Sequence, residues 1–558
     1  MTFTYTVSPA DWGRIAPVLV LVGMTLVIML VDLFLPHAGE RSKHTGPANF
    51  VILPTLAFLG VLGALAATIT LFVVGDHQPA FNNMVSSDDS ALYSQLIILS
   101  ACGLGILFSP AYLKRLNLVH QGEYYALLLL STTGMVLLAA AINFIIVFVG
   151  LEMLSLALYI LCSFIAQRRA SQEAGMKYFL LSSFASAFLL YGIALVYGTT
   201  GSTTFQTVAS FLNANHAAQS STLLLIAMGL MVVGFCFKVS AVPFHAWTPD
   251  VYQGAPAPIT AFMSVGTKAA AFIAFARVFD VALAPAKADW LPIVWVVTIL
   301  TIVGGNIMAL VQSNAKRMLA YSGIAHAGYL LIGIVIGSVV GIAAILFYLL
   351  CYVFMNVGAF GVVSLLEQRD NSGLDPADLR GLWYRQPVLA GCLAFFLLAL
   401  AGFPPMAGFA AKYYLFYSAL VGGQTDLLII GVLASILGMY YYLRVIATMF
   451  MEQGEAAVAP ATAPTPTSIP STPRRTPSTS LRSARGGTAV ASRPETAAVP
   501  KTPVQAVKST GQEETGGRLN WISWSGIIIA VLGTLAMGTV LAFWLVDLAQ
   551  QAATMMIH

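Results

Sequence analysis

The chain has 558 residues, of which 58% are hydrophobic and only 9% charged, and its net charge is +4. Soluble domains carry roughly 25% charged residues, so this composition excludes a soluble catalytic domain of any size. Apolar runs of about 20 residues, the length that crosses a hydrocarbon core of ~30 Å, recur from Ile15 almost to the C-terminus. The sequence therefore predicts an all-α polytopic membrane protein.

About fourteen transmembrane helices are expected. The predicted spans are 15–35, 49–74, 91–109, 123–141, 143–166, 172–198, 222–243, 256–281, 290–312, 317–336, 339–366, 387–420 (interrupted), 427–450 and 521–548. The first run ends without a small-residue cleavage site and another span follows soon after it, so we expect it to be retained as a helix and not removed as a signal peptide.

The lysines and arginines outside these spans indicate how the chain is oriented. Nineteen of them lie in loops that follow odd-numbered spans, between Arg41 and Arg518, whereas only Arg14 and Lys287 lie on the opposite side. Positive residues mark the cytoplasmic face. The expected location is therefore a bacterial inner or plasma membrane, with both termini on the outer, periplasmic side.

A segment of different composition precedes the last span. Residues 453–518 are rich in Pro, Ser, Thr, Ala and Arg and have almost no large apolar side chains, which is typical of a disordered or weakly ordered linker. A solvated spacer is one interpretation. The other is that its basic residues bind anionic lipid headgroups or a partner subunit.

Two spans contain proline in an otherwise apolar run. Lys238–Trp247 reads KVSAVPFHAW and Gly402–Lys412 reads GFPPMAGFAAK, so each break has a lysine beside it. Proline breaks a helix, and the freed backbone groups are tolerated at membrane depth only where protein or a water-filled cavity satisfies them. Two kinked helices that simply pack better would be the structural alternative.

The breaks lie in the seventh and twelfth spans, and an odd offset of five reverses the orientation in the membrane. We therefore expect two inverted five-helix repeats, spans 4–8 and 9–13, an architecture with ion sites at broken helices. The expected parts are helices 1–3 (1–122), the first repeat (123–281), the second repeat (282–452), the linker (453–518) and the C-terminal helix (519–558).

Six basic residues fall within predicted spans. Arg277 and Arg444 lie near helix ends, where they can reach the surface as anchors. The lysines are Lys177, Lys238, Lys268 and Lys412, and the last three have apolar sequence on both sides. A charge at the bilayer centre costs at least ~2.5–3.5 kcal/mol, so several of them in one chain indicate function.

Glu152 is the single acidic residue deep in a predicted span. Lys177 and Lys238 are its candidate partners, and the protonation of a buried Lys–Glu pair changes when a neighbouring charge moves. Lysine can release its proton on burial, whereas arginine cannot. This pattern favours a proton switch, although a static ion pair that holds two helices together is the alternative.

Two histidines accompany these charges. His245 follows the first break and His326 lies in the tenth span, and imidazole can pass a proton between its two nitrogens. They lie on different helices without a third ligand, so no metal site is expected, and a packing role for His326 stays open. For Asp250 we expect a place at the cytoplasmic surface and a structural role. The five cysteines have no spacing typical of iron–sulfur sites.

Four motifs together resemble a known family: FVGLEMLSLALYIL, KVSAVPFHAWTPDVYQGAPAPITAFMSVGTKAA, AKRMLAYSGIAHAGY and GFPPMAGFAAKYYLF. They are similar to the antiporter-like subunits of bacterial NADH:quinone oxidoreductase, complex I, and to subunit N best among these. The resemblance covers roughly residues 15–450 and the last helix. It implies fourteen helices with inverted five-helix repeats.

The resemblance also implies roles for individual residues. It implies that Glu152 pairs with Lys238, that Lys177 and Lys268 continue a polar axis across the membrane, and that Lys412 ends the axis near the exit. His245 and His326 match family positions as well. Subunit M typically has glutamate in place of Lys412, and subunit L has a lateral helix for which no sequence remains here.

The function implied is proton translocation by a membrane-arm subunit of an enzyme complex, a translocase, coupled to quinone reduction in other subunits. No cofactor is expected in this chain, whereas the whole complex would use NADH, FMN, iron–sulfur clusters and quinone. Other membrane-arm subunits and the lipid bilayer are the expected partners, and no nucleic acid is expected. The alternatives are an Mrp-type cation/proton antiporter subunit, a ferredoxin- or hydrogenase-linked relative of complex I, and a scaffold without transport.

Overall fold

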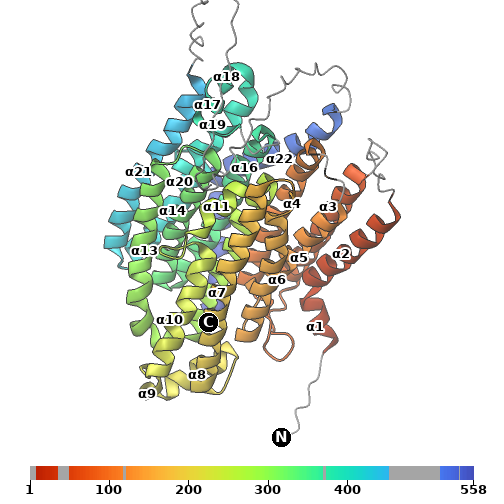
Figure 1. Ribbon diagram of the computed structural model, residues 1–558. Helices are drawn as coiled ribbons and strands as arrows, with labels where there is room; N and C mark the ends of the chain where they lie inside the picture. Colours follow the sequence, from red (N-terminus) through yellow and green to blue (C-terminus); the bar gives the residue numbers. More distant parts are fainter. Residues whose placement is uncertain are drawn as a thin grey trace, which may run out of the picture. The chain divides into compact units, whose positions relative to one another are not determined.

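The computed structural model describes residues 8–35, 49–116, 118, 121–368, 373–451, 516–539 and 541–557 (Figure 1). Within these ranges the chain forms helices joined by turns and short loops, with isolated β-bridges but no strand. The predicted all-α class is confirmed. Of the predicted linker, residues 453–515 lie outside the described residues, and Gly516 begins the last long helix.

Thirteen helical segments of the described residues are long and apolar enough to cross a membrane. They are α2 (Ala16–Phe34), α3 (Asn49–Val74), α4 (Asp89–Arg115), α5 (Gln121–Ala139), α6 (Phe144–Cys162), α7 (Arg169–Thr200), α10 (Thr222–Val239), α12 with η1 (Ala257–Ala282), η2 with α13 (Ala284–Leu310), α14 (Ala315–Ile336), α15 to α16 (Val339–Leu366), α21 (Thr425–Phe450) and Trp521–Gly538 of α22. The predicted interrupted span is present as α19 (Pro387–Ala401) and α20 (Ala407–Val421), which follow one another across the second break.

One boundary prediction was wrong. The last span was expected to run from 521 to 548, but α22 (Gly516–Gly538) ends earlier and a separate helix, α23 (Ala542–Ile557), follows it. A Cβ atom at Gly538 would clash with the carbonyl oxygen of Pro405 in the second break. Glycine therefore permits close packing at this point, and it is also a poor residue for a helix interior.

Short helices lie at the two ends of the bundle. In Figure 1, α1 (Pro9–Arg14), α8 (Phe205–Ala214) and α9 (His216–Gln219) lie at the lower end, and α17 (Pro376–Leu379) and α18 (Leu382–Arg385) lie at the upper end. α1 precedes the first span, and α8 and α9 follow the sixth. α17 and α18 follow the eleventh span. The alternation of loops expected from the sequence is therefore present in the fold.

The helices α12 and α14 form the centre of the bundle, because every residue of their most apolar segments is buried within the chain. Small residues permit this packing. A Cβ atom at Gly328 would lie 2.6 Å from the backbone nitrogen of Ile302, and one at Gly305 would lie 2.6 Å from that of Ala325. Such close approach of backbones is how membrane helices associate. It places the residues of α14 far from lipid.

The backbone follows the same sequence of conformations in the two helix breaks. α10 ends next to Ser240, which has φ +65°, and α19 ends next to Gly402, which has φ +94°. In each break a cis proline, Pro243 or Pro405, lies three residues further on. The first break continues into α11 (Trp247–Gly254) as the second continues into α20. Both predicted interruptions are confirmed as real ends of helices and not as simple kinks.

At one end of the bundle Arg277 and Asp88 form a buried ion pair of 2.5 Å. Asp88 also caps α4 by accepting a hydrogen bond from the backbone nitrogen of Ala91. Burial raises the pKa of this carboxyl, but the charge and hydrogen bonds of Arg277 outweigh burial and lower the pKa to about 2. Arg277 is only 3% exposed, so the expectation that it anchors at the surface was wrong.

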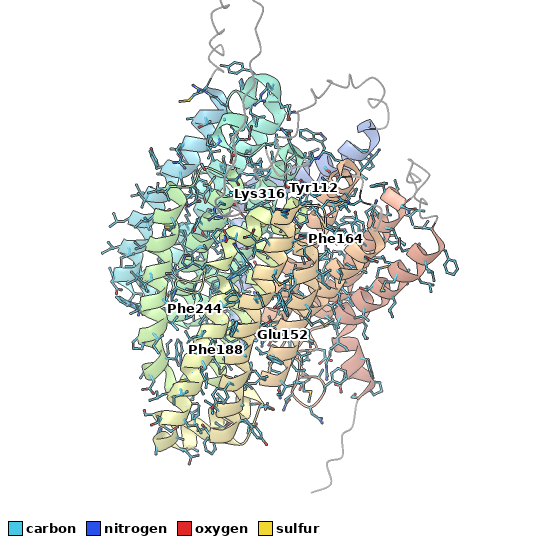
Figure 2. The ribbon with its side chains drawn as sticks, in the orientation of Figure 1. Tyr112, Glu152, Phe164, Phe188, Phe244 and Lys316 are labelled. Atoms are coloured by element: carbon cyan, nitrogen blue, oxygen red, sulfur yellow. The ribbon has the colours of Figure 1, made fainter. Side chains whose placement is uncertain are left out.

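At the other end, Glu367 binds three side chains. It accepts hydrogen bonds from Tyr112 at 3.0 Å and Arg168 at 2.5 Å, and it forms an ion pair with Lys316 at 3.3 Å. Figure 2 shows Tyr112 and Lys316 next to one another at this end. The sequence predicts Lys316 in a loop, but it is only 1% exposed and also donates to the carbonyl of Ala255. This cluster joins α4, α14 and the ends of α11 and α16.

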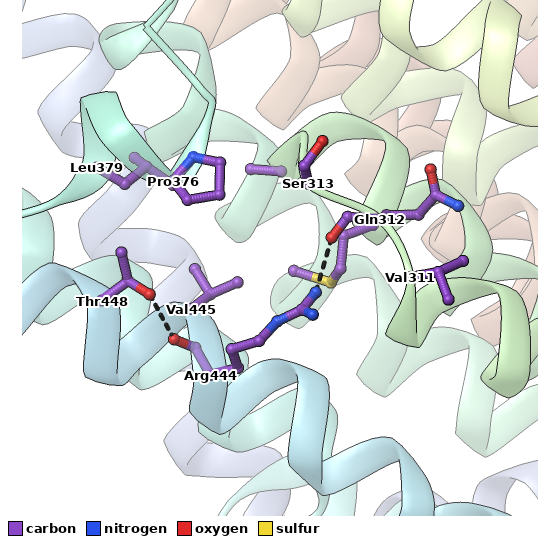
Figure 3. A pocket seen from close by; sticks show the side chains of 10 residues that line it. Val311, Gln312, Ser313, Pro376, Leu379, Arg444, Val445 and Thr448 are labelled. Atoms are coloured by element: carbon purple, nitrogen blue, oxygen red, sulfur yellow. Dashed lines mark hydrogen bonds between the residues drawn. The ribbon is translucent and has the colours of Figure 1, made fainter.

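Arg444 has the anchoring role that we expected. Its guanidinium donates to the carbonyl oxygens of Leu310 and Gln312, both at 2.7 Å, at the end of α13. It lines a pocket of about 220 Å³ between this loop, α17 and α21 (Figure 3). The loop between α13 and α14 is thereby held against α21.

Candidate functional site

Three lysines are buried where the sequence predicted them. Lys238 is 2% exposed, Lys268 is 1% exposed and Lys412 is 7% exposed. Lys238 lies in the last turn of α10, before the first break, and Lys412 lies on α20, after the second break. Lys268 lies between them on the central helix α12. The two break lysines therefore lie on opposite sides of their breaks, not at equivalent positions.

Lys238 is surrounded by hydroxyl groups. Its ammonium donates to Oγ of Ser155 at 2.7 Å and to the phenol oxygen of Tyr178 at 3.5 Å, and it lies 5.4 Å from the centre of the Tyr178 ring. Ser155 belongs to α6 and Tyr178 to α7. Hydroxyl groups both donate and accept, so they can hold either the ammonium or the neutral amine.

Glu152 lies on α6, one turn before Ser155 (Figure 2). Its charge acts on Lys238, but in the part of the chain that the structure describes no nitrogen forms an ion pair with it within 4.0 Å. Its Oε1 atom is buried and has no hydrogen-bond partner there. Glu152 therefore acts on Lys238 through space, by its charge, without an ion pair or hydrogen bond to it.

Lys177 lies in a different environment from the other three lysines. Its side chain is 40% exposed and forms ion pairs of 2.7 Å with Glu173 and with Asp250. The sequence left Lys177 and Lys238 as candidate partners of Glu152, and the structure pairs Lys177 with Glu173 and Asp250 instead. Asp250 is on α11 and also binds Arg317 at 2.6 Å.

Lys268 has a carbonyl and an aromatic ring as neighbours. Its ammonium donates to the backbone oxygen of Gly323 on α14 and lies 5.9 Å from the centre of the Tyr352 ring. The described residues place no carboxylate within ion-pair distance of it. Since an isolated charge is costly to bury, this position suits a lysine that also exists as the neutral amine.

His326 lies on α14, one turn after Gly323, and is 2% exposed. Its Nδ1 atom is 2.6 Å from the phenol oxygen of Tyr348, and its Nε2 atom is 3.2 Å from that of Tyr442. Each nitrogen of the imidazole therefore has its own hydroxyl group. An imidazole held in this way can accept a proton at one nitrogen and release one from the other.

Tyrosine rings connect His326 to the lysines on both sides. The Tyr352 ring, which lies under Lys268, is 5.1 Å from the imidazole centre. On the other side the Tyr329 ring is 5.8 Å from the imidazole and 5.6 Å from the ammonium of Lys412. The structure thus brings Lys268, His326 and Lys412 together in one polar row through α12, α14 and α20.

Lys412 is held next to the second break. Its ammonium donates to the carbonyl of Ala401, the last residue of α19, at 3.0 Å and to Oγ of Ser435 on α21 at 2.9 Å. The carbonyl is one of those that the end of α19 leaves free. The break therefore supplies an acceptor for a buried ammonium.

His245 lies in the first break and is half-buried. Its Nδ1 atom has no hydrogen-bond partner among the described residues, and its ring centre is 6.4 Å from that of Tyr321 on α14. It therefore lies between α10 and α14, and its ring contact is with Tyr321 instead of Lys238 or Lys268.

The sequence did not single out the hydroxyl residues that connect the lysines. They are Ser155, Tyr178, Tyr329, Tyr348, Tyr352, Ser435 and Tyr442. Tyrosine and serine are common in membrane helices, and these residues meet only in the fold. The signal that could have found some of them is their spacing of three or four residues from Glu152 and His326, which places them on the same helix face.

No group of three or more His, Cys, Asp or Glu side chains among the described residues could hold a metal ion. The row is made of lysine, histidine and hydroxyl groups, which bind and pass protons.

Comparison with known families shows the family of this chain. Residues 141–438, from the start of α6 through most of α21, match the family described as NADH:quinone oxidoreductase/Mrp antiporter, transmembrane. The matched region contains all seven predicted site residues. The chain belongs to this family.

Curated relatives carry more specific names. The NADH-quinone oxidoreductase subunit N of Trichlorobacter lovleyi is 45% identical over 441 residues, which are 79% of this chain and 88% of that relative. Subunit N of Chloroflexus aggregans is 41% identical over 457 residues, 82% of this chain and 91% of that relative. The resemblance to subunit N is confirmed over most of the chain.

Solved structures share the fold. A chain of respiratory complex I from Thermus thermophilus with bound aureothin is 30% identical, with a TM-score of 0.67 over 95% of this chain and 98% of that chain. A chain of the Mrp complex from Dietzia sp. is 20% identical, with a TM-score of 0.74 over 98% of this chain and 97% of that chain. The second comparison concerns the fold alone.

Proposed function

We propose that this chain is the proton-translocating subunit N of a bacterial NADH:quinone oxidoreductase, working in the membrane arm. The observation that carries this proposal is that three lysines, Lys238, Lys268 and Lys412, are buried with hydroxyl, carbonyl and aromatic neighbours and, among the described residues, no carboxylate within ion-pair distance. Permanently charged side chains at these buried positions would destabilise the protein without any functional gain. Groups that load and release protons explain why the lysines are there.

The chemistry follows from the neighbours of each group. An ammonium at Lys268 can release a proton toward His326, where the Tyr348 and Tyr442 hydroxyls bind the two nitrogens, and the proton leaves the imidazole toward Lys412. Each transfer turns one ammonium into an amine and protonates the next group. No electron is exchanged, so the energy must come from quinone reduction in other subunits of the complex.

Glu152 would set the charge state of Lys238. A nearby carboxylate stabilises the ammonium, and this stabilisation weakens if the carboxylate is neutralised or pairs with another cation. Because the structure shows no hydrogen bond or ion pair between Glu152 and Lys238, the interaction can change without breaking a direct contact between the two side chains. Lys177, with two carboxylate partners at the surface, would belong to the start of the axis, and His245 would belong to its path near the first break.

The remaining assignments complete the proposal. The matching breaks support two inverted repeats, residues 123–281 and 282–452, between helices 1–3 (1–122) and a C-terminal part (519–558) joined by the linker 453–518. Both termini would lie on the outer side of a bacterial membrane. The partners would be a neighbouring antiporter-like subunit and small membrane subunits, and NADH, FMN, iron–sulfur clusters and quinone would be bound elsewhere in the complex.

The test replaces Glu152 or Lys238 by Ala in the assembled complex, reconstituted in vesicles. General acid–base groups contribute about 10²- to 10⁴-fold to proton transfer, so we expect proton pumping to fall at least about tenfold, together with the coupled quinone reductase rate. Subunit content is measured by gel to control for assembly. Full pumping in both variants would overturn the proposal.

The relatives named subunit N, at 41% and 45% identity, favour complex I over an Mrp-type antiporter, whose solved structure is 20% identical. Purification of the native assembly separates the two. Copurifying flavin and iron–sulfur proteins indicate complex I, and a purely membranous assembly indicates an antiporter.

A further inference from the structure

Asp250 lies on α11, the half-helix that follows the first break, and faces a pocket of about 290 Å³ that is open to the surface. The other charged residues of the pocket are Glu173 and Lys177 of α7 and Arg317 of α14. The side chains of Asp250, Lys177 and Glu173 are 36%, 40% and 63% exposed. Water from the surface therefore reaches this carboxylate directly.

Both oxygens of Asp250 have cationic partners. Oδ2 accepts from Lys177 at 2.7 Å, and Oδ1 accepts from Arg317 at 2.6 Å. Lys177 is shared, because it is also 2.7 Å from Glu173. Lys177 can therefore stay paired with Glu173 when it releases Asp250. Arg317 pairs with Asp250 in the pocket, so it continues to hold this carboxylate.

Tyr178 links the two helices of the pocket wall, α7 and α11, to Lys238. It follows Lys177 on α7, and its phenol oxygen is 3.5 Å from the ammonium of Lys238. Its ring stacks at 4.6 Å on that of Trp247, the first residue of α11, one turn before Asp250. Tyr178 therefore contacts Lys238 with its hydroxyl group and α11 with its ring.

The second break offers a comparison. Lys412 lies seven residues after Pro405, and Asp250 lies seven residues after Pro243. Each half-helix after a break therefore carries a titratable side chain at the same distance from the proline. On α20 this side chain is buried and ends the polar row, and on α11 it lies in an open pocket.

We propose that Asp250 is the proton-loading residue of the axis, which takes protons from water in the pocket and passes them through Tyr178 to Lys238. This inference rests on the proposed function and adds the group at which the path begins. The carboxylate binds a proton from water and gives it up toward Tyr178. The Tyr178 hydroxyl gives its own proton to the neutral amine of Lys238 and takes the incoming one, so Lys238 becomes an ammonium and Asp250 returns to the carboxylate.

Lys177 is placed to control this step. Partial burial raises the pKa of Asp250, but the hydrogen bonds from Lys177 and Arg317 outweigh it and lower the pKa. The carboxylate thus stays ionised while both cations hold it. When Lys177 pairs with Glu173 alone, Asp250 loses one cation, its pKa rises, and it can take up a proton.

The test uses the assembled complex in vesicles and compares Asp250→Asn, Asp250→Glu and Tyr178→Phe. Asp426→Asn is the control, because this exposed carboxylate on α21 lies outside the pocket. We measure protons pumped and quinone reduced from about pH 6 to about pH 8.5, with subunit content as a check on assembly. Tyr178→Phe keeps every ion pair of the pocket, so it remains informative if Asp250→Asn fails to assemble.

Asp250→Asn should pump about tenfold more slowly at about pH 8, with partial recovery at about pH 6, since uptake without a carboxylate depends on free protons. Tyr178→Phe keeps the carboxylate but lacks the relay hydroxyl, so it should pump about tenfold more slowly at both pH values. Asp250→Glu should restore at least half of the rate, and Asp426→Asn should match the wild type. If the ion pair were purely structural, Asp250→Asn would reduce pumping equally at all pH values. That result, or wild-type pumping in Tyr178→Phe and Asp250→Asn, overturns the inference. Glu152→Ala and Lys238→Ala distinguish a failure of the Asp250 inference from a failure of the proposed function. If these two variants also pump fully, the proposed function itself fails.

Discussion

At the scale of single residues, the proposed proton path depends on lysines that can lose their charge. Lys268 is the best example, because it is 1% exposed and its partners are the Gly323 carbonyl and the Tyr352 ring. A carbonyl binds an ammonium and tolerates an amine. Arginine would keep the charge and the hydrogen bond, but it stays protonated in proteins.

The first prediction therefore concerns Lys268→Arg. If Lys268 relays protons, this variant should lose pumping by about tenfold or more although the positive charge remains. Lys268→Met is the matched variant, which removes the charge and keeps an unbranched apolar stem. Both are measured in reconstituted vesicles against subunit content. A Lys268→Arg variant that pumps like the wild type would show that the charge alone is needed.

At the scale of elements, the two helix breaks form polar sites at membrane depth. The end of α19 supplies the carbonyl of Ala401 to Lys412, and the end of α10 places Lys238 between α6 and α7. Each turn needs a residue of positive φ, which is Ser240 in one break and Gly402 in the other. For side chains other than glycine this conformation costs roughly 1–2 kcal/mol.

The second prediction concerns Gly402→Ala. A Cβ atom there would lie 3.2 Å from Cδ of Lys412, in addition to the strain at φ +94°. We expect a loss of stability of ~1–2 kcal/mol by thermal unfolding and a loss of pumping, because Lys412 must move.

Gly201→Ala is the control for this prediction. Gly201 has φ +71° at the end of α7, and no atom of the described residues lies within 4 Å of a Cβ built there. It should show the same loss of stability with normal pumping. Equal pumping in the two variants would mean that the position of Lys412 does not matter for transport.

At the scale of the whole molecule, two buried ion clusters hold the bundle at opposite ends of α4. Asp88 at one end binds Arg277 of η1, and Tyr112 near the other end joins Arg168 and Lys316 on Glu367. These clusters connect helices that are distant in sequence. The fixed carboxylates thus lie at the ends of the bundle, and the polar row lies between them.

The third prediction concerns Asp88→Asn and its dependence on pH. Asparagine keeps the helix cap but leaves Arg277 buried without a carboxylate, which should cost ~3–5 kcal/mol of stability. The folded pKa of about 2 lies below the value of ~3.9 for an unfolded chain. The contribution of Asp88 is therefore fully present above about pH 5 and is lost as the pH falls toward 2.

The measurement is thermal unfolding in detergent micelles between about pH 5 and about pH 8, the range in which Asp88 is ionised in both states. The difference between Asp88→Asn and the wild type should stay constant across this range. A difference that shrinks with falling pH inside the range would contradict the assignment, and so would a variant as stable as the wild type. Asp426→Asn, which changes an exposed carboxylate, should not alter stability.

Local properties of the chain already predict the spans, the two breaks and the buried lysines. Hydropathy, proline and charge are properties of single residues and short runs, so they can be recognised before the packing of the helices is known. Lys238, Lys268, Lys412 and His326 could therefore be chosen from the sequence alone. The motifs around them also indicated the family.

Which charges meet, in contrast, depends on how distant helices pack. Arg277 and Lys316 are buried because Asp88 and Glu367 come to them from other parts of the chain, and Lys177 is exposed because α7 extends past the apolar core. The tyrosines around His326 come from α14, α15 and α21, and no local pattern brings them together. A hydrogen bond between two helices forms only where packing brings donor and acceptor within reach, and this packing placed Asp250 between Lys177 and Arg317 in an open pocket.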